Sequence, residues 1–550
     1  MATTEQLLLQ ELKLPVFLGD RILCRVPPSA SAVNGGNNNF NGQQQRSKDG
    51  DASFVLYLPT VLLRKRHNPS FAFACRLANH YKVPLLVLVT VLDDKHLTSH
   101  SRSKISPPIV MTSRRLAFTL EALQESCCKE WESHGAGVAV RVHGPGSRTP
   151  HHLSLAHLAA AVVSDEPFVE PYRAYARKIT KTCLAASVPF WTVDGSTSVP
   201  PRSKLKRVKQ PPSTATASME GDVWFEGAPS KAWRWEKQTE SLRKQHVYGA
   251  HRERALDAPD IRYRLPPDFF LPRPPSRKEP DEEAVSRNNT DDGVVAIDGA
   301  SFDGDDDNNG NFNCNGSNTN TKTNSDSPWL ERILDFVPTK WKSKEASAPG
   351  QRPWSVTELC AIQDCKAWAM AWEGADPSVR PCKQTHGSRT AAKRRWRSFV
   401  ESGGLKNYAK QRNKITNPHA VSRVSAYLNL GILSIFDVLH DVWEAKSQRG
   451  HATGCNKFLD EVVKWREGSY VHAFANPNYH TAAVLPPWAR RHLESARKIS
   501  DGTMSAQNNI DGGYDYLQLE TASTRDETWN AMQDYLVDTG ELHNNARMTW

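Results

Sequence analysis

The feature that most constrains the fold is an unbroken apolar run at Pro84–Leu92, which is rich in β-branched residues. A run of this length and composition is typical of a strand that is buried on both faces of a sheet. Further short apolar runs lie on either side of it, and segments with helical spacing separate them. The sequence predicts strands at 54–58, 84–92, 138–142, 160–163 and 188–193, and helices at 69–81, 113–134, 151–158 and 172–184.

Strands that alternate with helices in this way predict a doubly wound parallel sheet, and therefore an α/β domain over residues 53–196. Ligands of such sheets bind outside the carboxyl ends of the strands. A Gly-x-Gly-x-x-Gly motif follows none of the predicted strands, so a dinucleotide site of the Rossmann type is not indicated.

The second half of the chain has a different composition. Of the 16 tryptophans, 11 lie at or after Trp329, and no alternating β pattern accompanies them. We predict an all-α domain over residues 328–550, with helices at 356–373, 387–401, 419–447, 456–474 and 486–498. Two other segments are predicted to be irregular: a flexible N-terminal segment at 1–52 and an interdomain connector at 197–327, which contains a disordered acidic and asparagine-rich insertion.

Charge and cysteine content limit the kind of protein. The excess of 70 Lys and Arg over 60 Asp and Glu gives a net charge of +10, which favours polyanionic partners. Ten cysteines without a Cys-x-x-Cys pair predict a reducing compartment and no zinc site. No apolar run has the length of a membrane span and no secretory signal opens the chain, so we expect a soluble intracellular protein. The basic run 202–209 is too short to decide between nucleus and plastid.

Two segments of the second domain could contact phosphates, and each has an ordinary structural alternative. The basic segment that contains Arg394, Arg395 and Arg412 fits a phosphate backbone and a solvated helix face about equally. The hydroxyls of Ser422–Ser434 fit a pyrophosphate seat at the start of a helix. From the residues alone, simple capping by serine is the favoured interpretation of that segment.

A third segment places a carboxylate beside an indole. Glu461 and Trp465 are four residues apart on a predicted helix, so they share one face. Such a pairing on an amphipathic helix carries little meaning by itself.

The chain closes with two predicted helices. Thr524 and Glu527 form a capping-box pattern that starts the first helix, and Gly540 suits its end because glycine adopts a left-handed backbone freely. On the second helix Asn544 and Met548 share a face. This inner face suits a bound planar ligand, while an ordinary amphipathic helix is the structural alternative.

Taken together, these motifs occur in one order and register that resembles the flavin-binding half of the photolyase/cryptochrome family. The N-terminal α/β half is similar to the antenna domain of that family. Within the family the chain is closest to the class II cyclobutane pyrimidine dimer photolyases, although Asn544 is similar to the class I pattern. The motifs that carry the family resemblance are Gly387-x3-Ala391-Ala392, Tyr408-x3-Arg412-Asn413, Ser422-Arg-Val-Ser425-x-Tyr427-Leu428-x2-Gly431-x2-Ser434, Glu461-x3-Trp465-Arg-Glu467, Trp529-Asn-Ala-x-Gln533 and Gly540-x2-His543-Asn544-x2-Arg547-Met548. The likeness to class II rests on Asn476-Pro-Asn-Tyr479, Trp488-Ala-Arg490 and Arg547-Met548-Thr-Trp550.

The resemblance implies an FAD cofactor held in the helical domain, and it allows an antenna chromophore whose identity the sequence does not predict. It implies electron transfer to the flavin through Trp529 and Trp550. The implied cofactor contacts are Tyr408, Val421, Ser422, Val424, Ser425 and Arg547.

The resemblance also implies a pocket for a flipped-out pyrimidine dimer. Trp465 is expected to stack on the lesion, Asn544 to bond its edge, and Glu461 to stabilise the dimer radical anion through its protonated form. The implied catalytic residues are Glu461, Trp465, Asn544 and Met548, and the candidate DNA-binding residues are Arg394, Arg395, Arg412 and Arg466.

The implied function is a blue-light-driven, FAD-dependent DNA photolyase that splits cyclobutane pyrimidine dimers by electron transfer from reduced flavin. Its expected partner is UV-damaged DNA, and its expected state is a monomer. Two alternatives stay open: a cryptochrome-like photoreceptor without repair, and a truncated, non-catalytic photolyase-like binding protein. In the family, the aspartates that face the flavin and a third tryptophan follow the position of Trp550, so we expect an incomplete C-terminus.

Overall fold

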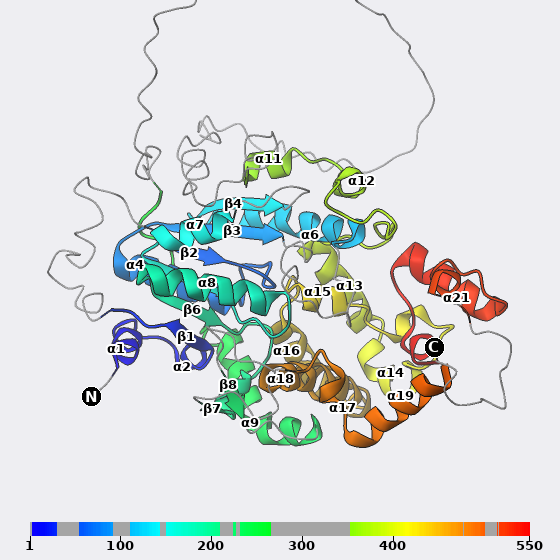
Figure 1. Ribbon diagram of the computed structural model, residues 1–550. Coiled ribbons are helices and arrows are strands. Elements are labelled where there is room, and N and C mark those ends of the chain that lie inside the picture. The colour runs from blue at the N-terminus through cyan, green and yellow to red at the C-terminus, as the bar shows by residue number, and fades with distance from the viewer. Residues whose placement is uncertain are drawn as a thin grey trace, which may run out of the picture.

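The computed structural model shows a sheet with helices on both faces, joined to a helical region (Figure 1). It describes residues 3–29, 54–91, 111–142, 150–208, 224–226, 232–265, 353–476, 478–500, 514 and 516–549. The predicted insertion in the connector and Trp550 lie outside these residues. No helix in the described part of the chain is long and apolar enough to cross a bilayer.

The five predicted strands form the centre of the sheet, and all of them are parallel. Their order is β6-β5-β2-β3-β4, so the prediction of a doubly wound parallel sheet is confirmed. The strands are β2 (Val55–Leu58), β3 (Leu85–Val91), β4 (Gly137–Val142), β5 (Ala161–Asp165) and β6 (Phe190–Val193).

Both edges of the sheet carry an antiparallel strand that the sequence pattern did not predict. Strand β1 (Ile22–Val26) pairs with β6, and β9 (Trp354–Ser355) pairs with β4. The prediction of a flexible segment over residues 1–52 is therefore wrong for its first half. That half forms the helices α1 (Thr4–Glu11) and α2 (Val16–Gly19) before β1, because Leu8, Leu18 and Ile22 bury their side chains in the core.

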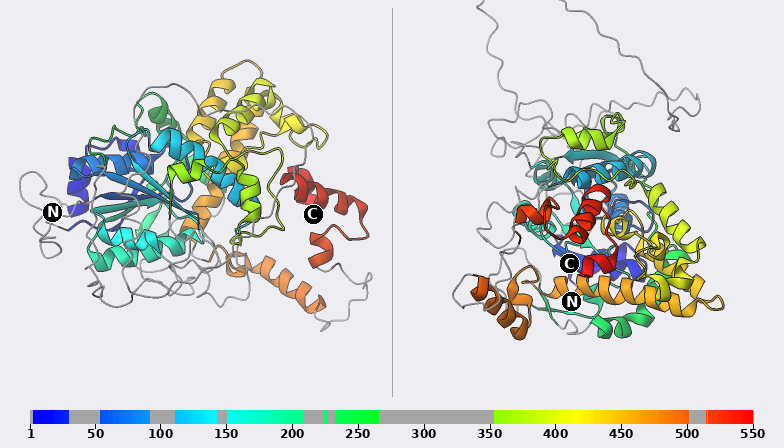
Figure 2. Two further views of the ribbon diagram at one scale, coloured as in Figure 1. Left: turned by 90° about the horizontal axis from the view of Figure 1, so that it is seen from above. Right: turned by 90° about the vertical axis from the view of Figure 1, so that its right-hand side faces the viewer.

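The two faces of the sheet bury different helices. Val55 and Tyr57 pack into one hydrophobic cluster with α4 (Pro69–Tyr81) and α6 (Ser113–Glu125). Leu56 and Leu58 point the other way, as side chains along a strand must, and pack with α7 (His151–Leu158) and α8 (Tyr172–Ala186). In the view from above, α8 and α6 accordingly lie on opposite sides of the sheet (Figure 2).

The strand order reverses between β2 and β5, where doubly wound sheets commonly hold a ligand. Here the chain's own loop fills that position. One oxygen of the Asp165 carboxylate accepts hydrogen bonds from the backbone N–H groups of Thr60, Val61 and Leu62 at 2.8, 2.9 and 3.1 Å. Its other oxygen accepts from the Tyr57 hydroxyl at 3.0 Å. The candidate functional site therefore has to be sought in the helical region.

The helical region confirms the predicted all-α character, with different boundaries. The predicted helix 356–373 is two helices because Asp364 caps a new one, accepting from Lys366 N and Ala367 N. The helices are α11 (Val356–Cys360), α12 (Cys365–Ala371), α13 (Arg389–Glu401), α14 (Gly404–Gln411), α15 (Ser425–Asn429), α16 (Ile435–Lys446), α17 (Ala452–Leu459), the π-helix η5 (Asp460–Glu467), α18 (Gly468–Ala475), α19 (Pro487–Ser500), α20 (Tyr516–Glu520), α21 (Glu527–Thr539) and α22 (Asn544–Thr549).

The predicted helix 419–447 is broken by a turn at Gly431. Its φ of +62° suits glycine, and a Cβ there would lie 2.2 Å from the carbonyl oxygen of Val61. The buried Arg64 side chain donates to the Gly431 carbonyl at 2.5 Å. The break thus brings the helical region against the loop that follows β2.

Part of the predicted connector is a packed helix, which corrects the assignment of 197–327 as linker and insertion. Helix α9 (Ala232–His251) packs against α16, α18 and η5. Its Trp235 and Val247 are buried, so α9 belongs to the core between the two domains.

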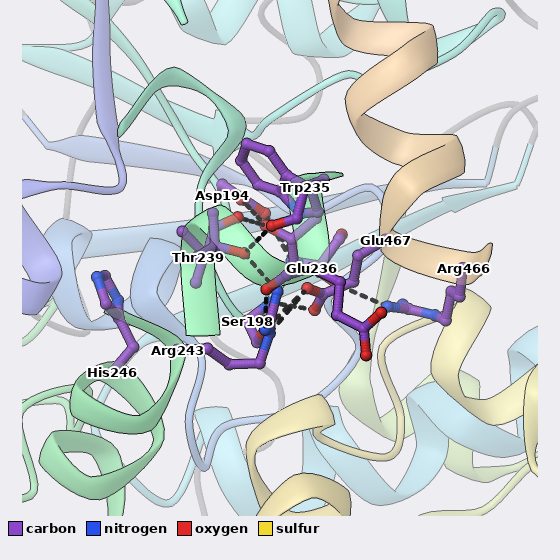
Figure 3. Close-up of polar contacts among 12 residues, drawn as sticks. Asp194, Ser198, Trp235, Glu236, Thr239, Arg243, His246, Arg466 and Glu467 are labelled. Atoms are coloured by element: carbon purple, nitrogen blue, oxygen red, sulfur yellow. Dashed lines mark hydrogen bonds and ion pairs between the residues drawn. The ribbon is translucent and has the colours of Figure 1, made fainter. Parts of the chain in front are cut away.

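A buried polar network lies where the sheet, α9 and η5 meet (Figure 3). Glu467 has no exposed surface, and its carboxylate accepts hydrogen bonds from Ser198 N at 2.5 Å and Ser198 Oγ at 2.8 Å. Arg243 Nε donates to Ser198 Oγ at 3.0 Å and lies 3.6 Å from Glu467 Oε2. The two domains are therefore joined through paired, hydrogen-bonded charges rather than through apolar surface alone.

Close helix packing supplies the first test of the fold. Gly454 of α17 faces α14, and a Cβ at this position would lie 2.0 Å from the Leu405 carbonyl oxygen. We expect Gly454→Ala to lower the free energy of unfolding by about 2 kcal/mol, the cost of forcing two backbones apart. Denaturant unfolding measures it.

Gly19→Ala is the matched control, because nothing lies within 4 Å of the added methyl group at the end of α2. There the smaller backbone freedom of alanine predicts unchanged or slightly higher stability. Equal effects of the two substitutions would contradict the close approach of α14 and α17.

Candidate functional site

The predicted site residues gather around the end of α14. Tyr408 lies on the last turn of this helix, and its ring contacts Phe458 of α17 with 5.1 Å between ring centroids. Burial raises the pKa of the Tyr408 phenol. The Arg412 guanidinium lies over the same ring, 5.8 Å from its centroid. The Tyr408 ring thus contacts both an aromatic ring and a cation.

Glu461 joins this cluster from η5. Its carboxylate forms an ion pair with Arg412 and a second with Lys457 Nζ at 3.0 Å. The predicted contact of Glu461 with a lesion stays a prediction; in this structure Arg412 and Lys457 hold the carboxylate.

Two of the four residues predicted to line the lesion pocket are accessible. The Trp465 side chain is 55% exposed, and Lys464 Nζ lies 5.1 Å from its ring centroid. Met548 of α22 is 74% exposed. An exposed indole beside a cation is a surface on which a base can stack close to a phosphate.

Helix α22 reaches the end of α14 through polar contacts. Asn545 Nδ2 donates to the Asn413 carbonyl at 3.1 Å. The neighbouring Asn544 Oδ1 is buried and has no hydrogen-bond partner among the described residues. Since a buried amide oxygen without a partner is unfavourable, this position fits a ligand that donates a hydrogen bond. The residues present are thus compatible with a polar, planar cofactor such as FAD at this end of α22. Arg547, a predicted cofactor contact, is exposed on the same short helix.

The segment before α22 is anchored by a carboxylate that the sequence analysis missed. Glu541 pairs with Arg395 at 2.6 Å and with Arg423 at 3.1 Å, and it accepts from the Thr385 hydroxyl at 3.1 Å. Arg395 was predicted to bind DNA, but its charge is already paired with Glu541. Its position favours a structural role.

The predicted phosphate-binding segment has a mixed environment. Val424 is buried, Val421 and Ser422 are half-buried, and Ser425 is exposed as the first residue of α15. Helix α15 has only five residues. Helix α15 follows Arg423, which pairs with Glu541, so the Ser422 and Ser425 hydroxyls lie near the candidate site. Their predicted contact with the cofactor phosphates stays a prediction.

The four arginines predicted to bind DNA differ in availability. Arg412 is paired with Glu461, and Arg466 donates to the Ser196 carbonyl at 3.0 Å, which places it in the domain junction. Arg394 is exposed on the outer face of α13. This face carries an open depression of about 630 Å³, lined by Thr390, Lys393, Arg394, Arg397, Ser398, Glu401 and Ser402.

Trp529, the predicted electron-transfer residue within the described chain, is partly buried on α21. Its Nε1 donates to the Leu519 carbonyl at 3.4 Å. The helix is capped by Asp526, which accepts from Thr528 N and Trp529 N, so the predicted start at Thr524 is wrong by two residues. Gly540 ends it with a φ of +70°, as predicted. Trp550 lies outside the described residues.

Comparison with known proteins relates part of the chain to one family. The sequence is 32% identical to the deoxyribodipyrimidine photo-lyase of Arabidopsis thaliana over 146 residues, which is 26% of this chain and 27% of the relative. It is 33% identical to that of Oryza sativa subsp. japonica over 147 residues, again 26% of the chain and 27% of the relative. The matched segment thus spans about a quarter of the length of these relatives. No family model matches.

Among solved structures, the cryptochrome of Synechocystis sp. PCC6803 has a TM-score of 0.47 at 13% identity, covering 91% of this chain and 74% of that one. A class III photolyase from Agrobacterium tumefaciens has a TM-score of 0.44 at 16% identity, covering 92% and 72%. Over the matched segment, about a quarter of the chain, the sequence is similar to the deoxyribodipyrimidine photo-lyases of two plants. Assignment to class II stays a prediction.

Proposed function

We propose that this protein is an FAD-dependent, blue-light-driven DNA photolyase that splits cyclobutane pyrimidine dimers. The observation that supports it most is the junction at Arg412 and Asn413: Arg412 binds Glu461 of η5, and Asn413 accepts a hydrogen bond from Asn545 of α22. Beside Asn545, the buried Asn544 Oδ1 has no partner among the described residues. Relatives of the matched segment are named deoxyribodipyrimidine photo-lyase.

In this proposal each residue has a separate task. FAD, when bound, would supply light-driven electron transfer to the lesion. Trp465 offers its exposed indole to a base that has left the stack. Asn544 Oδ1 accepts a hydrogen bond from the cofactor or the lesion edge. Arg412 and Lys457 hold the Glu461 carboxylate in place. The exposed basic face of α13, including Arg394, attracts the phosphate backbone.

Three measurements on the purified full chain test the proposal. We expect flavin absorbance after reconstitution with FAD, tighter binding to DNA that contains a pyrimidine dimer than to undamaged DNA, and loss of dimers under blue light but not in the dark. A chain that folds and yet takes up no flavin would refute it, and so would dimers that persist under illumination.

The Glu461 ion pairs favour one second candidate, a cryptochrome-like flavin photoreceptor without repair. Arg412 and Lys457 already occupy the carboxylate that would have to contact a reduced dimer. Photoreduction of bound flavin in a chain that binds damaged and undamaged DNA equally would favour this candidate.

Trp465 gives the proposal a residue-level prediction. We expect Trp465→Ala to weaken binding to dimer-containing DNA about 10- to 100-fold, because stacking of a base on an aromatic ring contributes about 1–3 kcal/mol. Titration of a labelled duplex with and without the dimer measures it.

Trp488→Ala is the matched control, because Trp488 is similarly exposed at 62% but belongs to a different helix, α19. It should leave the preference for damaged DNA unchanged. If both substitutions, or neither, reduce that preference, Trp465 has no specific role in lesion binding.

A further inference from the structure

Outside the candidate flavin and DNA site, two histidines and an aspartate converge from three parts of the chain. His67 lies in the loop before α4, His251 is the last residue of α9, and Asp437 lies in the first turn of α16. His67 Nδ1 is 3.2 Å from Asp437 Oδ1, and His251 Nε2 is 3.6 Å from the same oxygen. The three donor atoms all lie within 4.8 Å of one another.

These separations resemble those of a tetrahedral zinc site. Zinc bonds of about 2.0–2.1 Å to nitrogen and oxygen place neighbouring ligand atoms roughly 3.3 Å apart. Two of the donor pairs are already at nearly this separation. His67 Nδ1 is buried, with the Asp437 carboxylate as its polar neighbour at 3.2 Å. His251 Nε2 also lies 3.2 Å from the Phe436 carbonyl oxygen, a contact that an ion would replace.

The surroundings orient two of the three side chains. The ring of His440 stacks on His251 with 4.0 Å between centroids and an angle of 22° between the planes. The His67 ring packs edge-on against Phe436 at 6.2 Å. Rings held in this way lose little conformational entropy when they bind an ion, which favours coordination.

One cation competes for the same carboxylate. Arg66 Nη2 lies 4.0 Å from Asp437 Oδ1, but its side chain is 53% exposed. An exposed guanidinium at that distance contributes little and can turn into solvent when an ion binds. It therefore does not block the site.

We propose that His67, His251 and Asp437 bind one zinc ion, with water as the fourth ligand. Imidazole and carboxylate donors suit zinc, and three protein ligands leave the fourth position open. The ion would fasten the loop after β2 to α9 and α16, and so would hold both domains and the connecting helix together. This site is independent of the proposed photolyase activity. The sequence analysis expected no zinc site because the cysteines form no Cys-x-x-Cys pair, and the proposed site uses no cysteine.

The test uses the full chain after removal of metal with a chelator. Equilibrium dialysis against zinc, followed by elemental analysis, should find one zinc per chain. Cobalt in place of zinc should give the intense visible absorption of a tetrahedral site. The thermal midpoint should rise with zinc and fall again with chelator, because a ligand of the folded state stabilises it.

Two substitutions locate the ion. His251→Gln and Asp437→Asn should each weaken zinc binding at least tenfold, since each removes one ligand. His440→Ala is the control, because His440 touches His251 without belonging to the donor set, and it should still bind one zinc per chain. Near-ultraviolet circular dichroism checks that each variant is folded.

Less than one zinc per chain in the wild type, or undiminished binding in both ligand variants, would overturn the proposal. The wild-type cobalt spectrum decides the matter without the variants if these fail to fold. An octahedral spectrum, or no spectral change, would also contradict the three-ligand site.

Discussion

Glu467→Ala is expected to lower the free energy of unfolding by about 3–5 kcal/mol, the usual cost of removing one partner of a buried ion pair. Glu467 is fully buried, and Arg243 beside it is 3% exposed. Without the carboxylate, the Arg243 charge and the Ser198 N–H and hydroxyl lose their partner inside the domain junction. Urea unfolding followed by circular dichroism measures the change.

Helix α9, which carries Arg243, also supplies the control. Glu240 and Lys244 form an ion pair at 2.8 Å on the surface of α9, with both side chains more than half exposed. Glu240→Ala should change stability by about 0.5 kcal/mol or less, because water and salt screen such pairs. A loss below about 1 kcal/mol for Glu467→Ala would mean that water reaches the junction.

Acidification is expected to destabilise the protein between about pH 6.5 and 4 through His246. Burial, with the Arg21 charge, lowers the pKa of this histidine to about 4, against the opposing effect of Asp20. Arg21 Nη2 donates to His246 Nδ1 at 2.9 Å, and a guanidinium can only donate, so the ring is neutral. The unfolded state therefore takes up a proton near pH 6.5 that the folded state refuses until about pH 4.

The sign follows from this difference in bound protons. Stability from His246 is fully present above pH 6.5 and falls as the pH drops, by about 3 kcal/mol in total for a shift of this size. Denaturant unfolding at a series of pH values measures the slope. His246→Gln keeps a polar side chain without a titrating ring and should remove this part of the slope. A variant that keeps the full slope would assign the effect to other groups.

The parallel core of the fold could be predicted from the sequence because each of its strands is an apolar run and each helix repeats its apolar positions. The predicted helix 69–81 matches α4 residue for residue, since Asn68 caps it and Lys82 ends it in a left-handed conformation. The edge strands β1 and β9 could not be predicted. They are short, and their pairing depends on partners far along the chain.

The candidate site was predictable in its residue types but not in its contacts. Lys457 and Glu461 are four apart on a continuous helical stretch, so their ion pair could have been inferred from spacing. The pairing of Glu541 with Arg395 spans 146 residues, and no local pattern indicates it. Arg412, the other cation that Glu461 contacts, lies 49 residues away in the sequence, so only the local half of its pairing could be inferred.

The strand β9 also bears on the order in which the protein can mature during synthesis. It closes the edge of β4, yet it comes from residues 354–355, more than two hundred positions later in the chain. A nascent α/β domain therefore leaves the ribosome with one sheet edge open, and unpaired edges invite strands from other chains. The sheet acquires its last strand only as the helical region begins to emerge, which ties the solubility of the first domain to translation of the second.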